Sequence, residues 1–116
     1  MKRTPAVALD LPVKPISVNA LYKGKRYKSE EYKNFESELA YNLPLDARIG
    51  LEGPLVLEAT FYITNMRQDL DNLLKGLLDV LEHCGVYSND KQIVAIRATK
   101  EKAKEPRIKV KLYAET

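Results

Sequence analysis

Two periodic apolar patterns lie next to each other in the middle of the chain and limit the folds open to it. Residues 55–63 alternate between apolar and other side chains, which is typical of a strand with one buried face. A polar turn at 64–68 follows, and leucines then recur at helical spacing, which predicts a helix from about Asp71 to His83. Gly85 is a natural stop for that helix. The centre of the chain is therefore expected to be a strand joined by a short turn to an amphipathic helix.

The flanking sequence predicts a second helix and further strands. Residues 6–11 read as a first strand, and a helix is expected from an N-cap at Ser29 to about Asn42. Residues 93–99 and 108–114 look like a final pair of strands. This order predicts an α+β fold, with two main helices packed on a mixed, mostly antiparallel sheet. All of residues 1–116 are expected to form a single domain.

Composition excludes several classes of protein. The chain has 116 residues, of which 45% are hydrophobic and 30% charged, so whole-chain disorder is excluded. The one cysteine, Cys84, allows no intrachain disulfide and is expected to be a small buried apolar group. No apolar stretch is long enough to span a membrane, and the first residues lack the apolar core of a signal peptide. We therefore expect a cytoplasmic protein without a membrane partner.

The net charge of +3 hides an uneven distribution of charge. Residues 1–28 carry seven Lys or Arg and one acid, and residues 97–111 carry seven and two. The middle, 29–96, carries five basic residues and twelve acids. A positive face built from the two basic segments would suit a polyanion such as nucleic acid. Lysines that protect strand edges from aggregation would give the same pattern, so charge alone leaves both interpretations open.

The corner between the predicted strand and helix contains polar residues that could bind a metal ion or take part in catalysis. Asp69 and Asp71 lie two residues apart there, where both carboxylates can converge. Lys75 and then Asp79 follow Asp71 at intervals of four, which places Asp71, Lys75 and Asp79 on one helical face. Asp90 lies in a second acidic turn beyond the helix. Mg²⁺ prefers a few carboxylate oxygens together with water and substrate phosphate. Two carboxylates with a third from a neighbouring turn would suit it, and a nearby ammonium can offset charge on a transferring phosphate.

Each of these residues also has an ordinary structural interpretation. Asp69 or Asp71 can cap the helix, and Asp90 can form an Asx-turn. Lys75 can form surface ion pairs worth about 0.2–0.5 kcal/mol each. His83 is the only histidine and is expected at the surface in the last helical turn, so a histidine-based metal site or catalytic triad has little support.

The central polar pattern resembles the RusA family of Holliday junction resolvases. That family has Asp-x-Asp-Asn, then Lys and Asp, then a Gly and an Asp-Asp pair followed closely by Gln; residues 69–94 reproduce these offsets with one departure. The departure is Asn89, which stands where the family has the first Asp of its pair. An early Pro-Ser-x-Asn segment is similar too, with Ile16 inserted after Pro15. The resemblance extends from about Leu11 to Tyr113.

The resemblance implies an activity and a set of site residues. The family's metal-binding aspartates fall on Asp69, Asp71 and Asp90, and its functional lysine falls on Lys75. It implies a homodimeric, Mg²⁺-dependent endonuclease, with Mn²⁺ as a substitute metal, that nicks four-way DNA junctions symmetrically in recombination and repair. Members are often encoded by prophages. A site that needed both charges of the Asp-Asp pair would be weakened by Asn89.

Basic residues near both ends are the expected DNA contacts, because phosphates are bound by Lys and Arg side chains. They are Lys23, Lys25, Arg26 and Lys28 in the first basic segment, and Lys100, Lys102, Lys104 and Arg107 in the second. Two alternatives remain open: a non-catalytic protein that binds branched DNA, and a nuclease for other branched substrates such as flaps.

Overall fold

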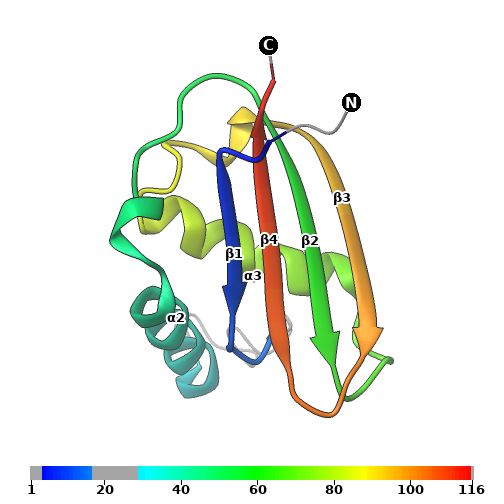
Figure 1. The fold of residues 1–116 in the computed structure, drawn as a ribbon. Helices are drawn as coiled ribbons and strands as arrows, with labels where there is room; N and C mark the ends of the chain where they lie inside the picture. The colour runs from blue at the N-terminus through cyan, green and yellow to red at the C-terminus, as the bar shows by residue number, and fades with distance from the viewer. Residues whose placement is uncertain (1–3, 17–28, 116) are drawn as a thin grey trace.

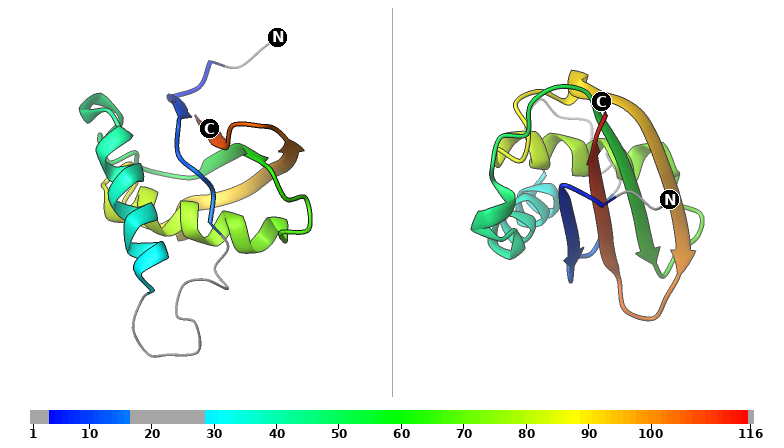
Figure 2. Two further views of the ribbon diagram at one scale, coloured as in Figure 1. Left: turned by 90° about the horizontal axis from the view of Figure 1, so that it is seen from below. Right: turned by 45° about the horizontal axis from the view of Figure 1, so that its top comes forward.

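The computed structural model describes residues 4–16 and 29–115, and its four strands form one sheet in the order β1-β4-β2-β3. β1 and β4 pair antiparallel, as do β4 and β2, whereas β2 and β3 are parallel. Both α-helices lie on one face of the sheet, with α3 crossing behind the strands and α2 lying towards β1 (Figures 1 and 2). The expected α+β class is confirmed. The elements are β1 (Val7–Leu11), α2 (Glu30–Asn42), η1 (Leu45–Ala47), β2 (Leu55–Ile63), α3 (Leu70–His83), η2 (Asp90–Gln92), β3 (Ile93–Lys102) and β4 (Arg107–Ala114).

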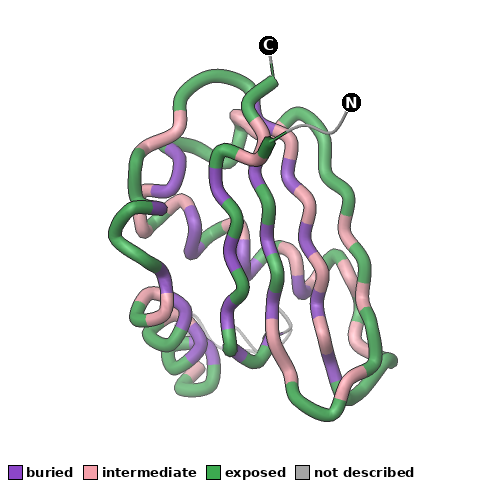
Figure 3. The backbone as a smooth tube through the Cα atoms, in the orientation of Figure 1, coloured by how far each residue is buried: buried purple, intermediate pink, exposed green. Residues whose placement is uncertain are grey.

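The core lies between the sheet and the two helices. Every second residue of β2 is buried, as its alternating sequence predicts (Figure 3). α3 buries five residues of its apolar face, and α2 adds Tyr32, Phe35 and Leu39. Gly76 lies where the two helices meet, and a Cβ there would be in ordinary van der Waals contact with the ring of Phe35, at 3.5 Å. The other face of the sheet is open, and α3 packs its apolar face against the covered face.

The prediction that residues 93–99 and 108–114 form a strand pair is wrong, because β2 lies between β3 and β4. β3 follows β2 through α3, and a helical crossover returns the chain parallel to the first strand and beside it. The link at 103–106 then passes the end of β2 to reach β4 (Figure 1). Two strand spacings, about 9–10 Å, are within the reach of four residues. This topology places the carboxyl ends of β2 and β3 at the same edge of the sheet.

The helix boundaries follow the predicted signals. Ser29 caps α2, with its hydroxyl accepting a hydrogen bond of 3.1 Å from the backbone N–H of Tyr32. α3 begins after Asp69, and Gly85 follows its end with a φ of 82°, a conformation that favours glycine. Cys84 is half-buried rather than buried. None of the described helices is long and apolar enough to cross a membrane.

Candidate active site

The N-terminal end of α3 presents two exposed carboxylates. Asp69 occupies the N-cap position with extended backbone, φ −74° and ψ 132°, yet its side chain accepts no capping hydrogen bond. Asp71 lies in the first turn of the helix. The capping interpretation therefore does not describe the Asp69 carboxylate. The carboxylate oxygens of Asp69 accept none of the first N–H groups of the helix, and the helix dipole favours negative charge at this point.

Lys75 is exposed one helical turn beyond Asp71. Within the described residues, the structure records no ion pair between Lys75 and Asp71, so the surface-pair interpretation is not seen for these two. The Lys75 ammonium and the Asp71 carboxylate share the exposed side of α3, opposite the buried leucines, and the exposed Asp69 lies at the start of the helix. We call Asp69, Asp71 and Lys75 the α3 N-terminal site.

The second acidic turn lies beyond the other end of α3. The backbone N–H of Asp90 donates a hydrogen bond of 2.6 Å to Oε1 of Glu82, in the last turn of the helix. Tyr87 is buried beneath this turn and donates its hydroxyl to the carbonyl of Leu78 at 2.8 Å. Burial raises the pKa of the Tyr87 hydroxyl well above its usual range, and the carboxylates of Asp90, Glu82 and Asp79 raise it further. Acidic side chains therefore gather around the Asp90 turn, beyond the C-terminal end of α3. We call Glu82, Tyr87 and Asp90 the α3 C-terminal site.

A capping box fixes the backbone around Asp90. Asn89 accepts a hydrogen bond from the N–H of Lys91 at 2.8 Å, and Oε1 of Gln92 accepts the N–H groups of Ser88 and Asn89, both at 2.9 Å. The amide nitrogen of Gln92 donates to two carbonyls in the 51–53 loop, at 2.8 and 2.9 Å. Asn89 is therefore used as a cap, a task that Asn and Asp perform about equally well. The Asn89 departure preserves the shape of the turn.

The structure does not bring Asp90 to Asp69 and Asp71 within one chain. α3 has 14 residues, which at a rise of about 1.5 Å per residue separates its two ends by about 20 Å. Among the described residues, no group of three or more His, Cys, Asp or Glu is arranged to hold a metal ion. Asp69 and Asp71 remain as a pair, which fits Mg²⁺, because this ion is often bound by only one or two carboxylates with water and substrate phosphates.

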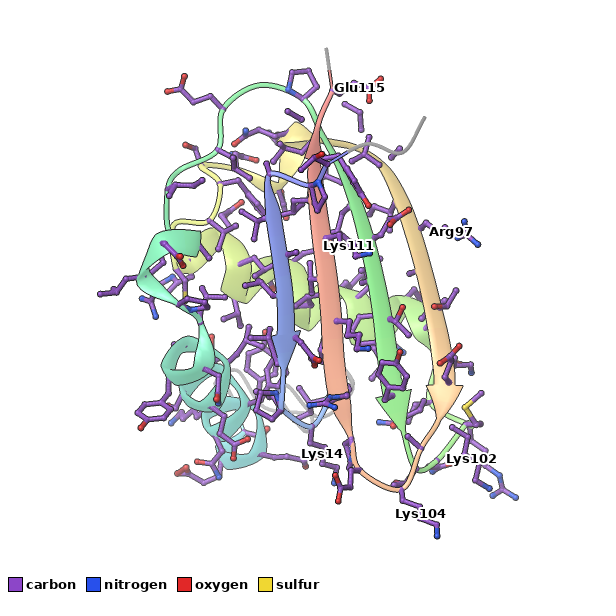
Figure 4. All side chains as sticks on the ribbon, viewed as in Figure 1. Lys14, Arg97, Lys102, Lys104, Lys111 and Glu115 are labelled. Carbon is purple, nitrogen blue, oxygen red and sulfur yellow. The ribbon has the colours of Figure 1, made fainter. Side chains whose placement is uncertain are left out.

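The predicted DNA contacts lie in different environments. Lys102 and Lys104 are exposed at the end of the sheet, as Figure 4 shows. Lys100 is half-buried and donates to two backbone carbonyls, whereas Nε of Arg107 lies 3.1 Å from a carboxylate oxygen of Asp10. These two side chains thus have partners within the protein. Four predicted contacts lie outside the described residues: Lys23, Lys25, Arg26 and Lys28.

Sequence reasoning overlooked the residues that fix these turns. The spacing of Asn89 and Gln92 is that of a capping box and is a usable signal. The contact of Glu82 with the Asp90 turn has no such signal, because it depends on how the chain folds back after Gly85. The role of Lys100 depends on β3 being next to β2, which the sequence analysis did not predict.

Comparison with known proteins identifies the class to which this protein belongs. The model of a family described as "Endodeoxyribonuclease RusA" matches residues 12–113. "Crossover junction endodeoxyribonuclease RusA" of Aquifex aeolicus (strain VF5) is 33% identical over 86 residues, which cover 71% of this chain and 68% of that protein. "Crossover junction endodeoxyribonuclease rusA" of Enterobacteria phage HK97 is 33% identical over 90 residues, covering 72% of this chain and 73% of that protein.

The protein is an endodeoxyribonuclease by class, an enzyme that hydrolyses phosphodiester bonds within DNA. More particularly, the chain belongs to the RusA family. The resemblance carried by residues 69–94 is confirmed.

Proposed function

We propose that this protein resolves Holliday junctions in DNA recombination and repair, as a Mg²⁺-dependent homodimer that introduces paired symmetric nicks. Two relatives of similar length are named for cleavage at crossover junctions, which supports the substrate. The observation that carries the assignment of the site is the pair of carboxylates at the start of α3, exposed and without a capping role for Asp69.

The α3 N-terminal site supplies the groups that phosphodiester hydrolysis needs. Asp69 and Asp71 would hold Mg²⁺, which when bound activates water and offsets charge on phosphate. Lys75 would place its ammonium against the phosphate and stabilise the charge that develops there. The N–H groups of the first helical turn also favour a bound phosphate. Without the metal, the two carboxylates would repel the same phosphate, so the site would bind DNA best when they are neutralised.

A two-fold dimer would account for both the symmetric nicks and the placement of Asp90. Two opposed nicks require two sites in matching symmetry, which a two-fold dimer provides. Because Asp90 lies about 20 Å from Asp71 along α3, it does not complete the site of its own chain. We propose that Asp90 joins the partner's Asp69 and the partner's Asp71, so that each site is shared between the two chains.

Cleavage of a labelled synthetic four-way junction tests the proposed function. The wild-type protein should nick the junction at two symmetric positions in Mg²⁺, and should leave a linear duplex and a flap of the same sequence intact. Asp71→Asn should abolish cleavage but keep or strengthen junction binding, because it removes a charge that repels phosphate. Asp46→Asn is the matched control, since Asp46 is an exposed acid in η1.

Three results would contradict the proposal in different ways. Junction binding without cleavage in Mg²⁺ or Mn²⁺ would indicate a non-catalytic binding protein. Equal cleavage of the flap would indicate a nuclease for branched DNA in general. Wild-type cleavage by Asp71→Asn would exclude the α3 N-terminal site.

A further inference from the structure

The half-buried Lys100 reaches out of the sheet to the turn that carries Asp69. In the parallel register Lys100 pairs with Phe61, so its side chain lies on the face that the helices cover. Its Nζ donates hydrogen bonds of 2.8 Å to the carbonyl oxygens of both Met66 and Gln68. Gln68 immediately precedes Asp69, the N-cap of α3. An ammonium has three donors, and here the backbone of this one turn accepts two of them.

The turn has little else to hold it in place. Its internal hydrogen bonds both involve Asn65: the Oδ1 atom accepts the N–H of Arg67 at 3.0 Å, and the carbonyl accepts the N–H of Gln68 at 3.4 Å. In the part of the chain that the structure describes, no other side chain from outside residues 64–69 is recorded as hydrogen-bonding to the turn. Loops with so few restraints open locally at low cost in free energy. Among the described residues, Lys100 therefore supplies the only recorded side-chain hydrogen bonds that reach this turn from outside residues 64–69.

We propose that Lys100 is a positioning residue, which fixes the turn at 64–69 and thereby the orientation of Asp69 at the start of α3. This role rests on the proposed function of the α3 N-terminal site, and it replaces the sequence-based assignment of Lys100 to DNA binding. Displacement of a catalytic group by about 1 Å can lower a rate by about a hundredfold. A lysine that ties two carbonyls can exert this control without contacting DNA.

Lys100→Met tests the proposal, because methionine keeps an unbranched apolar side chain and removes the ammonium. Lys111→Met is the matched control, since Lys111 is an exposed strand lysine of β4 on the open face of the sheet (Figure 4). Hydrogen–deuterium exchange at residues 65–70, measured without DNA or metal, should be about tenfold faster in Lys100→Met and unchanged in Lys111→Met. Lys100→Arg should restore much of the protection, because a guanidinium also donates to two carbonyls.

Kinetics then separates positioning from DNA binding. At saturating junction, single-turnover cleavage by Lys100→Met should fall about ten- to a hundredfold, while its junction Kd stays within about twofold of wild type. Lys100→Arg should recover part of the rate. A lysine that merely stabilised the fold would lower the Tm without this split between rate and Kd.

Two results would overturn the positioning role. The first is hydrogen exchange at 65–70 in Lys100→Met that stays at the wild-type rate. The second is a higher junction Kd with a flatter salt dependence and a normal cleavage rate at saturation, which would identify a phosphate-binding lysine. Lys100→Arg decides the same question if the methionine variant fails to fold. A wild-type protein that cleaves no junction would contradict the proposed function instead, and the exchange comparison would still decide on Lys100.

Discussion

The two ends of α3 carry proposed site carboxylates on turns that are fixed in different ways. Beyond the C-terminal end, local hydrogen bonds from Glu82, Asn89 and Gln92 fix the backbone around Asp90. At the N-terminal end, one lysine from a strand distant in sequence restrains the turn before Asp69. In both cases the residues that hold the backbone are not the proposed ligands. Variants of the residues that hold the Asp90 turn should therefore change stability most, and variants of Lys100 at the N-terminal end should change rate most.

Apart from the aspartate variants, which should abolish cleavage, the largest effect should come from Lys75, because the charge that it is proposed to stabilise develops only during the reaction. Lys75→Ala should lower single-turnover cleavage at saturating junction by about 10²–10³, since removing one such donor removes stabilisation of developing charge. Junction affinity and Tm should change little. Lys75→Arg should rescue poorly, because a planar guanidinium differs in geometry from an ammonium. A folded, dimeric alanine variant that cleaves within about twofold of the wild-type rate would show that Lys75 is an ordinary surface residue without a catalytic role.

Lys102 and Lys104 should act on DNA affinity rather than on rate or stability. Both are exposed at the end of the sheet, and neither has the carbonyl partners of Lys100. Replacing both with alanine should weaken junction binding and flatten the dependence of log K on log salt by about two units, because each lysine is expected to neutralise one phosphate. Cleavage at saturating junction should stay near wild type. An unchanged slope in a salt titration would show that this end of the sheet does not bind DNA.

The difference between the two ends of α3 also explains what the sequence could predict. Helix α3, strand β2 and the cap at Ser29 follow from periodicity and local hydrogen bonding, so their predicted bounds agree with the structure to within one residue. The pairing of β3 with β2 depends on a crossover through α3, and a short link between two apolar segments looks the same whether or not a strand lies between them. The role of Lys100 follows from that pairing.

The candidate site was predictable in its residue types but not in its arrangement. The spacing of Asp71 and Lys75 places them on one exposed face of α3, and Asp69 lies next to them in the sequence at the N-cap. Asp90 is separated from them by the whole of α3, and no periodic pattern tells the direction in which the chain turns after Gly85. Sequence spacing therefore predicts a site within one helix better than a site that joins two ends of a helix.

Gln92→Ala should cost stability, in contrast to Asp71→Asn. The variant lacks the four hydrogen bonds that tie Ser88, Asn89 and the 51–53 loop together, which predicts a lower free energy of unfolding by about 1–3 kcal/mol. Asp71→Asn should change it by less than about 0.5 kcal/mol. Urea unfolding with an unchanged m-value measures both. Equal stabilities would remove the contrast between the two ends.

The smallest effect concerns Tyr87 and depends on pH. Because the pKa of this buried hydroxyl is raised in the folded protein, its contribution to stability is present below the unfolded-state value of about 10 and is lost as pH rises above it. Tyr87→Phe should lower stability by about 1 kcal/mol at neutral pH, because the bond to Leu78 is removed. Its stability should then fall less steeply above pH 10 than that of wild type. Parallel alkaline curves for the two proteins would contradict this account of Tyr87.

Complementation between two inactive variants tests the central claim, that each site takes Asp69 and Asp71 from one chain and Asp90 from the other. Asp71→Asn and Asp90→Asn would be produced together with different affinity tags and purified through both, so that every dimer contains one chain of each kind. If the active sites are shared, one of the two active sites of this heterodimer is intact. The heterodimer should then make single nicks in the junction but not the two opposed nicks that resolve it, with about half the wild-type number of cuts. Each variant alone should stay inactive. A heterodimer as inactive as its parents would contradict the account, because sites confined to single chains would both remain broken.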